Sequence, residues 1–276
     1  MKKLIFVLVI VYAVLASGCT RKSKDFVYLG QMMKGTSGFS AQEKIKGHVK
    51  EFKESYFWAQ EVNRKIEKGK RITRKDEETT LLVNSSMTEE YNSSGIVLRS
   101  TLFNDNGENF QDYIVEAEGK IISKFLYKVY DTVRVYGKYE YEGENPVLLT
   151  AYNSKTDSVM MSLKYEYDQN GNIIKTQTIL NRNEPTSYTL FNRDVKGNLV
   201  KIQRFNKDGK LTMQYDYTYN KKGERITHHQ QNFSTGVVVD YTITYEYDKM
   251  GNYIAIIYHK NGKPFVYCER EIKYYD

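Results

Sequence analysis

The sequence predicts an all-β fold, an extended antiparallel sheet of tandem β-hairpins that follows a signal peptide and a flexible tether. Three observations predict it. The 276 residues include 25 Tyr and 12 Phe but only 3 Pro and 1 Trp, and tyrosine is typical of half-buried strands. A four-residue turn motif recurs at regular spacing, and the segments between the turns alternate apolar with polar residues.

Residues 1–18 have the pattern of a secretory signal peptide. Met1-Lys-Lys precedes an apolar stretch from Leu4 to Ala16, which is shorter than the roughly 20 residues of a membrane-spanning helix and suits a signal peptide. Leu15-Ala-Ser-Gly-Cys19 resembles a bacterial lipobox, with Leu15 one residue further from the cysteine than is usual. We therefore expect cleavage before Cys19 and lipid attachment to its thiol. The alternative is an ordinary secretory signal that ends beside a cysteine.

The segment 19–45 is predicted to be the lipidated N-terminus and its tether, because Gly, Ser, Lys and Met occur there without a sustained period. Gly35-Thr-Ser-Gly38 is not the Gly-x-Ser-x-Gly motif of a nucleophilic serine. Only Gln42 to Lys50 has a signal for a short turn of helix. With two or more acyl chains on Cys19, the anchor would hold the protein stably on a membrane.

The repeated motif is Asn or Asp, two further residues, and then Gly. Type I turns prefer Asp or Asn at their first position, and a glycine at the fourth makes the bulge that restores strand pairing. Gly171, Gly197 and Gly223 are 26 residues apart, with minor turns between them, so that each strand with its turn has about 12–14 residues. Clear copies start at Asn92, Asn104, Asp168, Asp194, Asn206, Asn220 and Asp248, and weaker copies span Glu116 to Gly119 and His259 to Gly262.

Between the turns, apolar and polar residues alternate as they do in a sheet with one packed and one wet face. Leu211 to Tyr219 and Val237 to Tyr247 are the clearest cases, whereas Tyr253 to Tyr258 is apolar at every position and predicts cover on both faces. Val49 to Trp58 is a predicted strand, and Lys68-Gly69-Lys70 is a predicted turn. We therefore assign residues 46–276 to one β-hairpin repeat domain; whether its sheet is open or closed is left undecided.

Two segments resemble a known repeat family. Tyr165-Glu-Tyr-Asp-Gln-Asn-Gly-Asn-Ile173 and Tyr245-Glu-Tyr-Asp-Lys-Met-Gly-Asn-Tyr253 resemble the YD repeats of RHS-type proteins. The resemblance is clear over about 160–276 and weak over about 90–160. It implies a strip of β-hairpins and no catalysis, because the repeat residues of that family are scaffold residues.

The candidate chemical groups do not form a catalytic or metal-binding pattern. The four histidines are His48, His228, His229 and His259. His228 and His229 are adjacent on a predicted strand, so they point to opposite faces and do not share one ion. Cys268 lies in an apolar strand-like run and is expected to be buried. We predict that the protein is not an enzyme and takes no cofactor or metal.

Two surfaces are candidates for binding. One is the basic segment 64–75, with Arg64, Lys65, Lys68, Lys70, Arg71, Arg74 and Lys75, which is either a solvated hairpin or a contact for anionic lipid or glycan. The other is the tyrosine-rich sheet, which either stacks on sugars or proteins or only holds a thin sheet together. The net charge is +7 and falls to +5 when Lys2 and Lys3 leave with the signal peptide, an excess too small for a nucleic-acid-binding protein.

The sequence as a whole therefore predicts a lipoprotein of a bacterial cell envelope, most plausibly at the outer membrane or cell surface. It would act as a non-enzymatic binding or scaffold module, with a protein or glycan partner that the sequence does not identify. A structural component that assists envelope assembly by edge-strand pairing is the first alternative. A hydrolase of envelope polymers is the second, and it would require a cleft with clustered carboxylates or histidines.

Overall fold

The computed structural model describes residues 26–27, 44–45, 47–73, 86–93, 96–118, 121–180 and 184–275. Two short strands, β1 and β2, pair with each other, and strands β3–β19 form a second, much larger sheet. The strands are β1 (Phe26–Val27), β2 (Lys44–Ile45), β3 (Val49–Val62), β4 (Lys65–Arg71), β5 (Met87–Tyr91), β6 (Val97–Phe103), β7 (Asn109–Glu118), β8 (Ile121–Val129), β9 (Thr132–Glu142), β10 (Asn145–Asn153), β11 (Val159–Tyr167), β12 (Ile173–Leu180), β13 (Pro185–Arg193), β14 (Leu199–Asn206), β15 (Leu211–Tyr219), β16 (Arg225–Asn232), β17 (Val238–Tyr247), β18 (Tyr253–Lys260) and β19 (Lys263–Tyr274).

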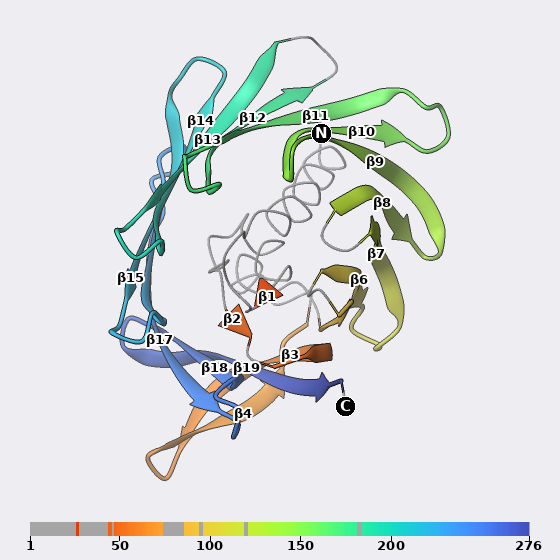
Figure 1. Cartoon of the computed structure of the whole chain (residues 1–276). Helices are drawn as coiled ribbons and strands as arrows, with labels where there is room; N and C mark the ends of the chain where they lie inside the picture. Colours follow the sequence, from red (N-terminus) through yellow and green to blue (C-terminus); the bar gives the residue numbers. More distant parts are fainter. Residues whose placement is uncertain are drawn as a thin grey trace.

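The large sheet is a closed antiparallel barrel (Figure 1). Its last strand, β19, pairs with its first strand, β3, from Val266 opposite Trp58 to Tyr274 opposite Val49. The other edge of β3 pairs with β5 over Glu51–Glu54 and with β4 over Phe57–Val62. Because β4 and β5 share this edge, the 17 strands occupy 16 positions around the ring. The all-β prediction is confirmed, but the extended strip is wrong, because the sheet closes and its terminal strands satisfy each other's backbone groups.

The predicted Asp-x-x-Gly turns have the expected geometry. At the turn after β11, the carboxylate of Asp168 accepts hydrogen bonds from the backbone N–H groups of Asn170 and Asn172 at 2.8 and 2.9 Å. The Gly171 N–H donates to the Asp168 carbonyl at 3.0 Å, and Gly171 has a φ of 78°, a conformation that side chains with a Cβ rarely adopt. The same pattern recurs at Gly107, Gly197, Gly209, Gly223 and Gly251. Gly95 and Gly119 lie outside the described residues.

Other turns differ from the prediction. Lys68-Gly69-Lys70 is not a turn but part of β4, and the chain reverses instead at Asn63 and Arg64, whose φ angles are 50° and 64°. These angles are those of a two-residue type I′ turn, which matches the strand twist without glycine when Asn occupies its first position. The hairpin after β18 reverses in the same way, at Asn261 and Gly262.

Two further segments are strands where the sequence suggested a turn or a helix. Glu116 to Glu118, the start of a weak turn motif, belongs to β7, and Glu118 pairs with Ile121. Gln42 to Lys50 was the only helix candidate, but it contains β2 and the start of β3. In both segments, pairing with a neighbouring strand overrides a weak local preference.

The turns of the 26-residue period all lie at one end of the barrel, because consecutive hairpin turns alternate between the two ends. We call this the proximal end, because the chain enters β3 there. The turn at 248–251 lies beside the end of β19, where the Asn252 side-chain amide donates to the Tyr274 hydroxyl at 2.6 Å. The opposite end, with turns such as 104–107 and 206–209, is the distal end.

Tyrosine hydroxyls connect successive hairpins at the proximal end. The Tyr219 hydroxyl donates to the Leu199 carbonyl at 2.8 Å, and the Tyr245 hydroxyl donates to the Arg225 carbonyl at 2.6 Å. Tyr141 and Tyr167 make the corresponding bonds to Ile122 and Pro146. Each of these four bonds reaches back 19–21 residues, to the first or second residue of the strand that precedes the tyrosine's own strand. The tyrosine of the repeat therefore has a physical role that its turn motif does not reveal.

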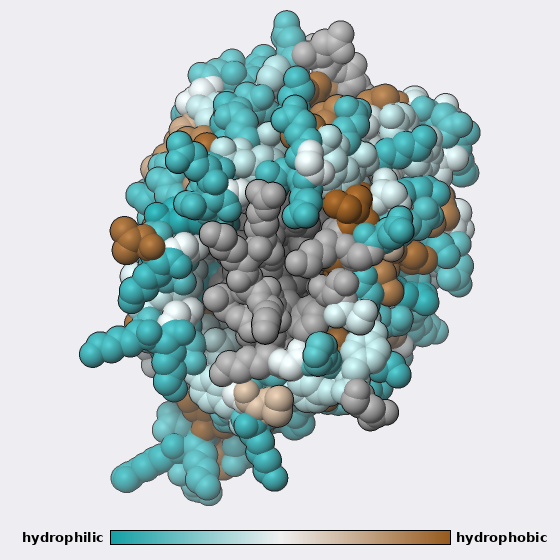
Figure 2. Space-filling view, viewed as in Figure 1, coloured by the Kyte–Doolittle hydropathy of each residue, from teal (hydrophilic) through white to brown (hydrophobic). Residues whose placement is uncertain are grey.

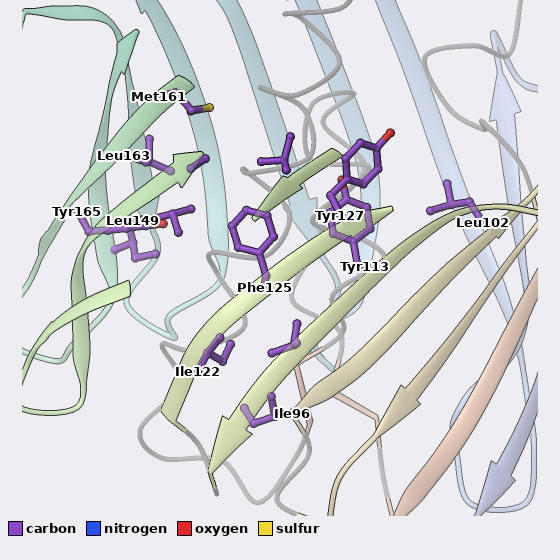
Figure 3. Packing of buried hydrophobic residues seen from close by; sticks show 14 of the residues in the cluster. Ile96, Leu102, Tyr113, Ile122, Phe125, Tyr127, Leu149, Met161, Leu163 and Tyr165 are labelled. Atoms are coloured by element: carbon purple, nitrogen blue, oxygen red, sulfur yellow. The ribbon is translucent and has the colours of Figure 1, made fainter. Parts of the chain in front are cut away.

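The inner face of the barrel holds the apolar core. Figure 3 shows Phe125, Tyr127, Leu149 and Leu163 projecting from the same side of neighbouring strands. The Phe125 ring lies directly over Gly137, where an added Cβ would come within 1.9 Å of the ring, so glycine is required at that position. Further clusters surround Tyr56 and Ile256, Val49 and Phe52, and Tyr215 and Tyr217. Of the segment Tyr253 to Tyr258, predicted to be covered on both faces, Ala255 to Tyr258 are buried, whereas Tyr253 is half-buried and Ile254 is exposed.

We expect Tyr219→Phe to lower the free energy of unfolding by about 1 kcal/mol, because it removes the hydroxyl donor and leaves the Leu199 carbonyl without its bond. Tyr217 is the matched control on the same face of β15; its buried hydroxyl has no hydrogen-bond partner among the described residues. Tyr217→Phe should therefore leave stability unchanged or raise it. Urea denaturation followed by circular dichroism measures both, and equal losses would contradict a role for the tyrosine bonds.

Candidate functional site

The outer face of the barrel is covered by charged and polar side chains, many of them paired across strands. Five ion pairs and one histidine–aspartate hydrogen bond join residues that lie directly opposite each other in the register. They are Lys53–Glu271, Lys124–Glu116, Lys175–Glu166, Lys201–Asp216, His229–Asp240 and Lys273–Glu51, with separations of 2.6–3.7 Å. Figure 2, which looks onto one end of the barrel, shows mainly hydrophilic side chains with scattered hydrophobic ones around the rim. Each exposed pair adds little stability, but together these side chains make the outer face hydrophilic.

One outer-face ion pair is different because half of it is buried. Asp112 accepts hydrogen bonds from the Arg99 guanidinium at 3.0 and 3.1 Å, from the Thr101 hydroxyl at 2.6 Å and from the Asn109 amide at 2.9 Å. Burial opposes ionisation of Asp112, yet these donors lower the pKa of its carboxyl below the usual value. The group is a fixed, fully bonded anion that holds β6 and β7 together.

The inner face carries a buried charged cluster between β19, β3 and β5. The Arg270 Nε donates to Glu54 Oε1 at 2.8 Å, and the Tyr56 hydroxyl also donates to Glu54. On β5, the Tyr91 hydroxyl donates to Glu89 at 2.8 Å. Glu54 and Glu89 are both 0% exposed. Burial first, and then the Glu89 carboxylate, raise the pKa of Tyr91 well above its usual value, so this tyrosine stays a donor.

The two adjacent histidines lie on opposite faces of β16, as predicted. His228 is buried among the rings of Tyr215, Tyr217 and Tyr241, with centroid distances of 5.2–5.9 Å. Burial, and next the Arg225 guanidinium, lower the pKa of His228 well below its usual value, so it is neutral. His229 points outward and bonds Asp240 at 2.7 Å. Within the described part of the chain, no group of three or more His, Cys, Asp or Glu side chains is placed to hold a metal ion.

The other predicted site residues have separate places in the structure. Cys19, the predicted lipid attachment residue, lies outside the described residues, as do Arg74 and Lys75 of the basic segment. Arg64 to Arg71 form the turn and second strand of the β3–β4 hairpin, where Lys68 bonds Glu269 at 2.6 Å. Cys268 is fully buried, as expected. Within the described residues, no helix has the length and apolar character needed to cross a membrane.

The tyrosines divide unequally between the two faces. Most line the interior, including Tyr113 and Tyr127, whose stacked rings lie 5.1 Å apart. Two stacked aromatic pairs lie on the outer face. Tyr136 and Tyr152 have centroids 5.0 Å apart, and Tyr188 and Phe205 have centroids 4.6 Å apart. In both outer pairs the residues are direct cross-strand partners whose rings stack on each other, an arrangement that stabilises the sheet.

The buried charged cluster was missed from the sequence, although a signal for it is present. Val49, Phe52, Tyr56 and Trp58 give β3 an apolar face, and Glu54 interrupts it at a position in register with its neighbours Phe52 and Tyr56. A charge at an apolar position of an alternating strand indicates a buried partner. The partner, Arg270, lies 216 residues away in the sequence, so only barrel closure reveals it.

These faces define a closed, single-layer antiparallel β-barrel with an apolar interior and a polar exterior. The sequence matches no protein-family model and no curated protein. The resemblance to YD repeats therefore rests on the turn motif alone.

Solved structures include a similar fold. A porin-like protein from Bacteroides uniformis has a TM-score of 0.52 at 11% identity, over 82% of this chain and 98% of that one. A porin-like protein from Bacteroides vulgatus scores 0.34 at 9% identity, over 83% of this chain and 99% of that one. The Photorhabdus luminescens Tc holotoxin pore scores 0.34 at 12% identity, over 79% of this chain and 14% of that one. Of these three TM-scores, only the first is high enough to indicate a shared fold, and at 11% identity it says nothing of a shared function.

Arg270→Met is expected to lower the free energy of unfolding by about 3–5 kcal/mol, because it leaves the buried Glu54 carboxylate without its cation. The matched control is Lys273→Met on the same pair of strands, where the exposed Lys273–Glu51 pair faces water. Its effect should be much smaller. Equal effects in urea denaturation would show that the buried pair is not the main interaction at this closure.

Proposed function

We propose that the protein is a non-enzymatic binding or scaffold module of a bacterial cell envelope, held on a membrane by lipid on Cys19. The observation that carries this proposal is the polar outer face, because it favours a barrel that sits in water and is tethered rather than immersed. The lipobox-like sequence before Cys19 supplies the tether. Protein and glycan partners both remain compatible with this surface.

The two faces of the barrel are reversed relative to a barrel that spans a bilayer. Such barrels carry an outward apolar band about 25 Å tall and a polar interior. Here Lys138, Lys164 and Lys175 project outward from the middle of β9, β11 and β12, while Leu149 and Leu163 face inward. Each lysine on a lipid-facing surface would cost about 2–4 kcal/mol at the bilayer centre. This chain can therefore share the backbone fold of a porin-like protein and still lie outside the bilayer.

The inner carboxylates favour a structural role over hydrolysis. A hydrolase needs carboxyl groups that a polymer can reach. Glu54 and Glu89 are fully buried and are hydrogen-bonded to Arg270, Tyr56 or Tyr91. Envelope assembly by edge-strand pairing also loses support, because β19 and β3 pair with each other and close the sheet.

The tether is tested by replacing residues 1–19 with a conventional cleavable secretory signal. We expect the resulting chain 20–276 to be released from membranes by washing with high salt, whereas the lipidated wild-type protein stays with the membranes after the same wash. If the exported, unlipidated barrel still resists alkaline extraction from membranes, the barrel itself is embedded and the proposal is wrong. Cys268→Ala in the wild-type background is the control, because it removes the buried thiol and should leave membrane association unchanged.

The side of the membrane is a separate question, tested with a specific protease site placed between Lys155 and Thr156 in an exposed distal turn. For a protein displayed on the cell surface, we expect cleavage by protease added to intact cells. Resistance to the protease until the envelope is opened would place the barrel on the inner side of the outer permeability barrier. The same site in purified protein is the control and must be cleaved.

A further inference from the structure

The two ends of the barrel differ in the residues at their turn tips. Three neighbouring proximal turns, at 194–197, 220–223 and 248–251, carry four exposed lysines, Lys196, Lys221, Lys222 and Lys249. The distal turns carry exposed charges of both signs, with Asp105, Asp131, Asp157 and Asp208 alongside Lys155 and Lys207. We call the three proximal turns the basic arc.

The basic arc also exposes large apolar side chains at its tips. Val195 is 104% exposed and Met250 is 54% exposed. Each lies in a turn next to a lysine, Lys196 and Lys249 respectively. Side chains at such tips contribute nothing to the barrel core, so their apolar character has no explanation in the stability of the fold. Apolar tips beside lysines are typical of segments that contact the interface of an anionic membrane.

The carboxylates within the arc are engaged in the turns. Asp194 accepts the backbone N–H groups of Lys196 and Asn198 at 2.9 and 2.8 Å, and Asp248 accepts the Asn252 N–H and the Tyr274 hydroxyl at 2.8 and 2.7 Å. They are half-buried beneath the lysines, which extend into solvent. The outermost charges of the arc are therefore positive.

The chain enters the barrel beside the basic arc. Gly47 precedes β3, and a Cβ built on it would lie 3.5 Å from Met250 Cε and 3.3 Å from Tyr274 Cε1. The chain thus enters β3 next to an exposed apolar tip. Lipid on Cys19 would hold the barrel near the membrane through the tether, and the basic arc lies at the end of the barrel where β3 begins.

We propose that the basic arc binds the surface of an anionic membrane, with its four lysines on lipid headgroups and with Val195 and Met250 in the interface. This inference rests on the proposed tether and adds an orientation to it: the proximal end faces the membrane and the distal end faces away. Basic segments next to a lipid anchor bind anionic leaflets through the same electrostatic attraction. Lys222 is also positioned by the Tyr247 ring, 5.5 Å from its Nζ.

The experiment uses the complete mature chain without lipid and measures co-sedimentation with vesicles. We expect binding to vesicles of phosphatidylglycerol and phosphatidylethanolamine and little binding to vesicles of phosphatidylcholine. Changing Lys196, Lys221, Lys222 and Lys249 to Glu should weaken binding by about tenfold or more. The matched control changes four exposed distal lysines, Lys155, Lys207, Lys210 and Lys263, to Glu; net charge falls equally, and binding should change by less than about twofold. Equal losses in the two variants, or no binding by the wild-type chain, would overturn the proposal.

Insertion of the tips is measured with a polarity-sensitive fluorophore on a single introduced cysteine. With anionic vesicles, the emission of labelled Val195→Cys should shift to the blue, and that of labelled Phe233→Cys at a distal turn should not. An unshifted Val195 label would overturn the insertion of the tip. These outcomes are independent of the fractionation experiment: a protein that needs its lipid for membrane association, yet fails both vesicle tests, would keep its tether and lose the proposed orientation.

Discussion

The pairing of β19 with β3 is the constraint on which the rest of the structure depends. Nine residue pairs are in register there, and they place Arg270 opposite Glu54 on the inner face. A slip of one residue would move Arg270 to the outer face and leave a buried carboxylate without its cation. The ion pair therefore specifies the register of closure as well as contributing to it. Closure in turn covers the apolar face and removes both open edges of the sheet.

The barrel is consequently a closed sheet whose two faces differ in polarity. Apolar and aromatic side chains such as Tyr113 and Phe125 are crowded on the concave side, while ion-paired residues such as Lys175 and Glu166 spread over the convex side. A bilayer-spanning barrel needs the opposite distribution. The similarity to the Bacteroides uniformis porin-like protein thus lies in the path of the backbone, whereas the chemistry of the faces follows from this chain's own residues.

The sequence predicted the features that short segments determine. The turn at Asp168–Gly171, the alternation around Tyr215 and the opposite faces of His228 and His229 all follow from local geometry. Closure was not predictable in this way, because it joins strands more than 200 residues apart that have no shared motif. Turns without the motif were also missed: Asn63 and Arg64 adopt positive φ without glycine, whereas Gly69 lies within a strand. Cys19 and its tether remain a prediction.

The repeat period explains why the two ends of the barrel differ. At four proximal positions a tyrosine hydroxyl donates to the carbonyl at the start of the preceding strand, as Tyr219 does with Leu199. Tyr141 makes this bond beside the two-residue turn of Gly143 and Glu144, so the bond does not require one turn length. The bonds made by Tyr141, Tyr167, Tyr219 and Tyr245 all join proximal positions. Turn length, by contrast, varies at both ends: the distal turns range from the two residues Tyr130 and Asp131 to the longer Ser154–Ser158 loop, and the proximal turns from Gly143-Glu144 to Asp168–Gly171. In the proposed orientation the distal end faces away from the membrane, so sequence changes there would alter a recognition surface without disturbing these proximal bonds.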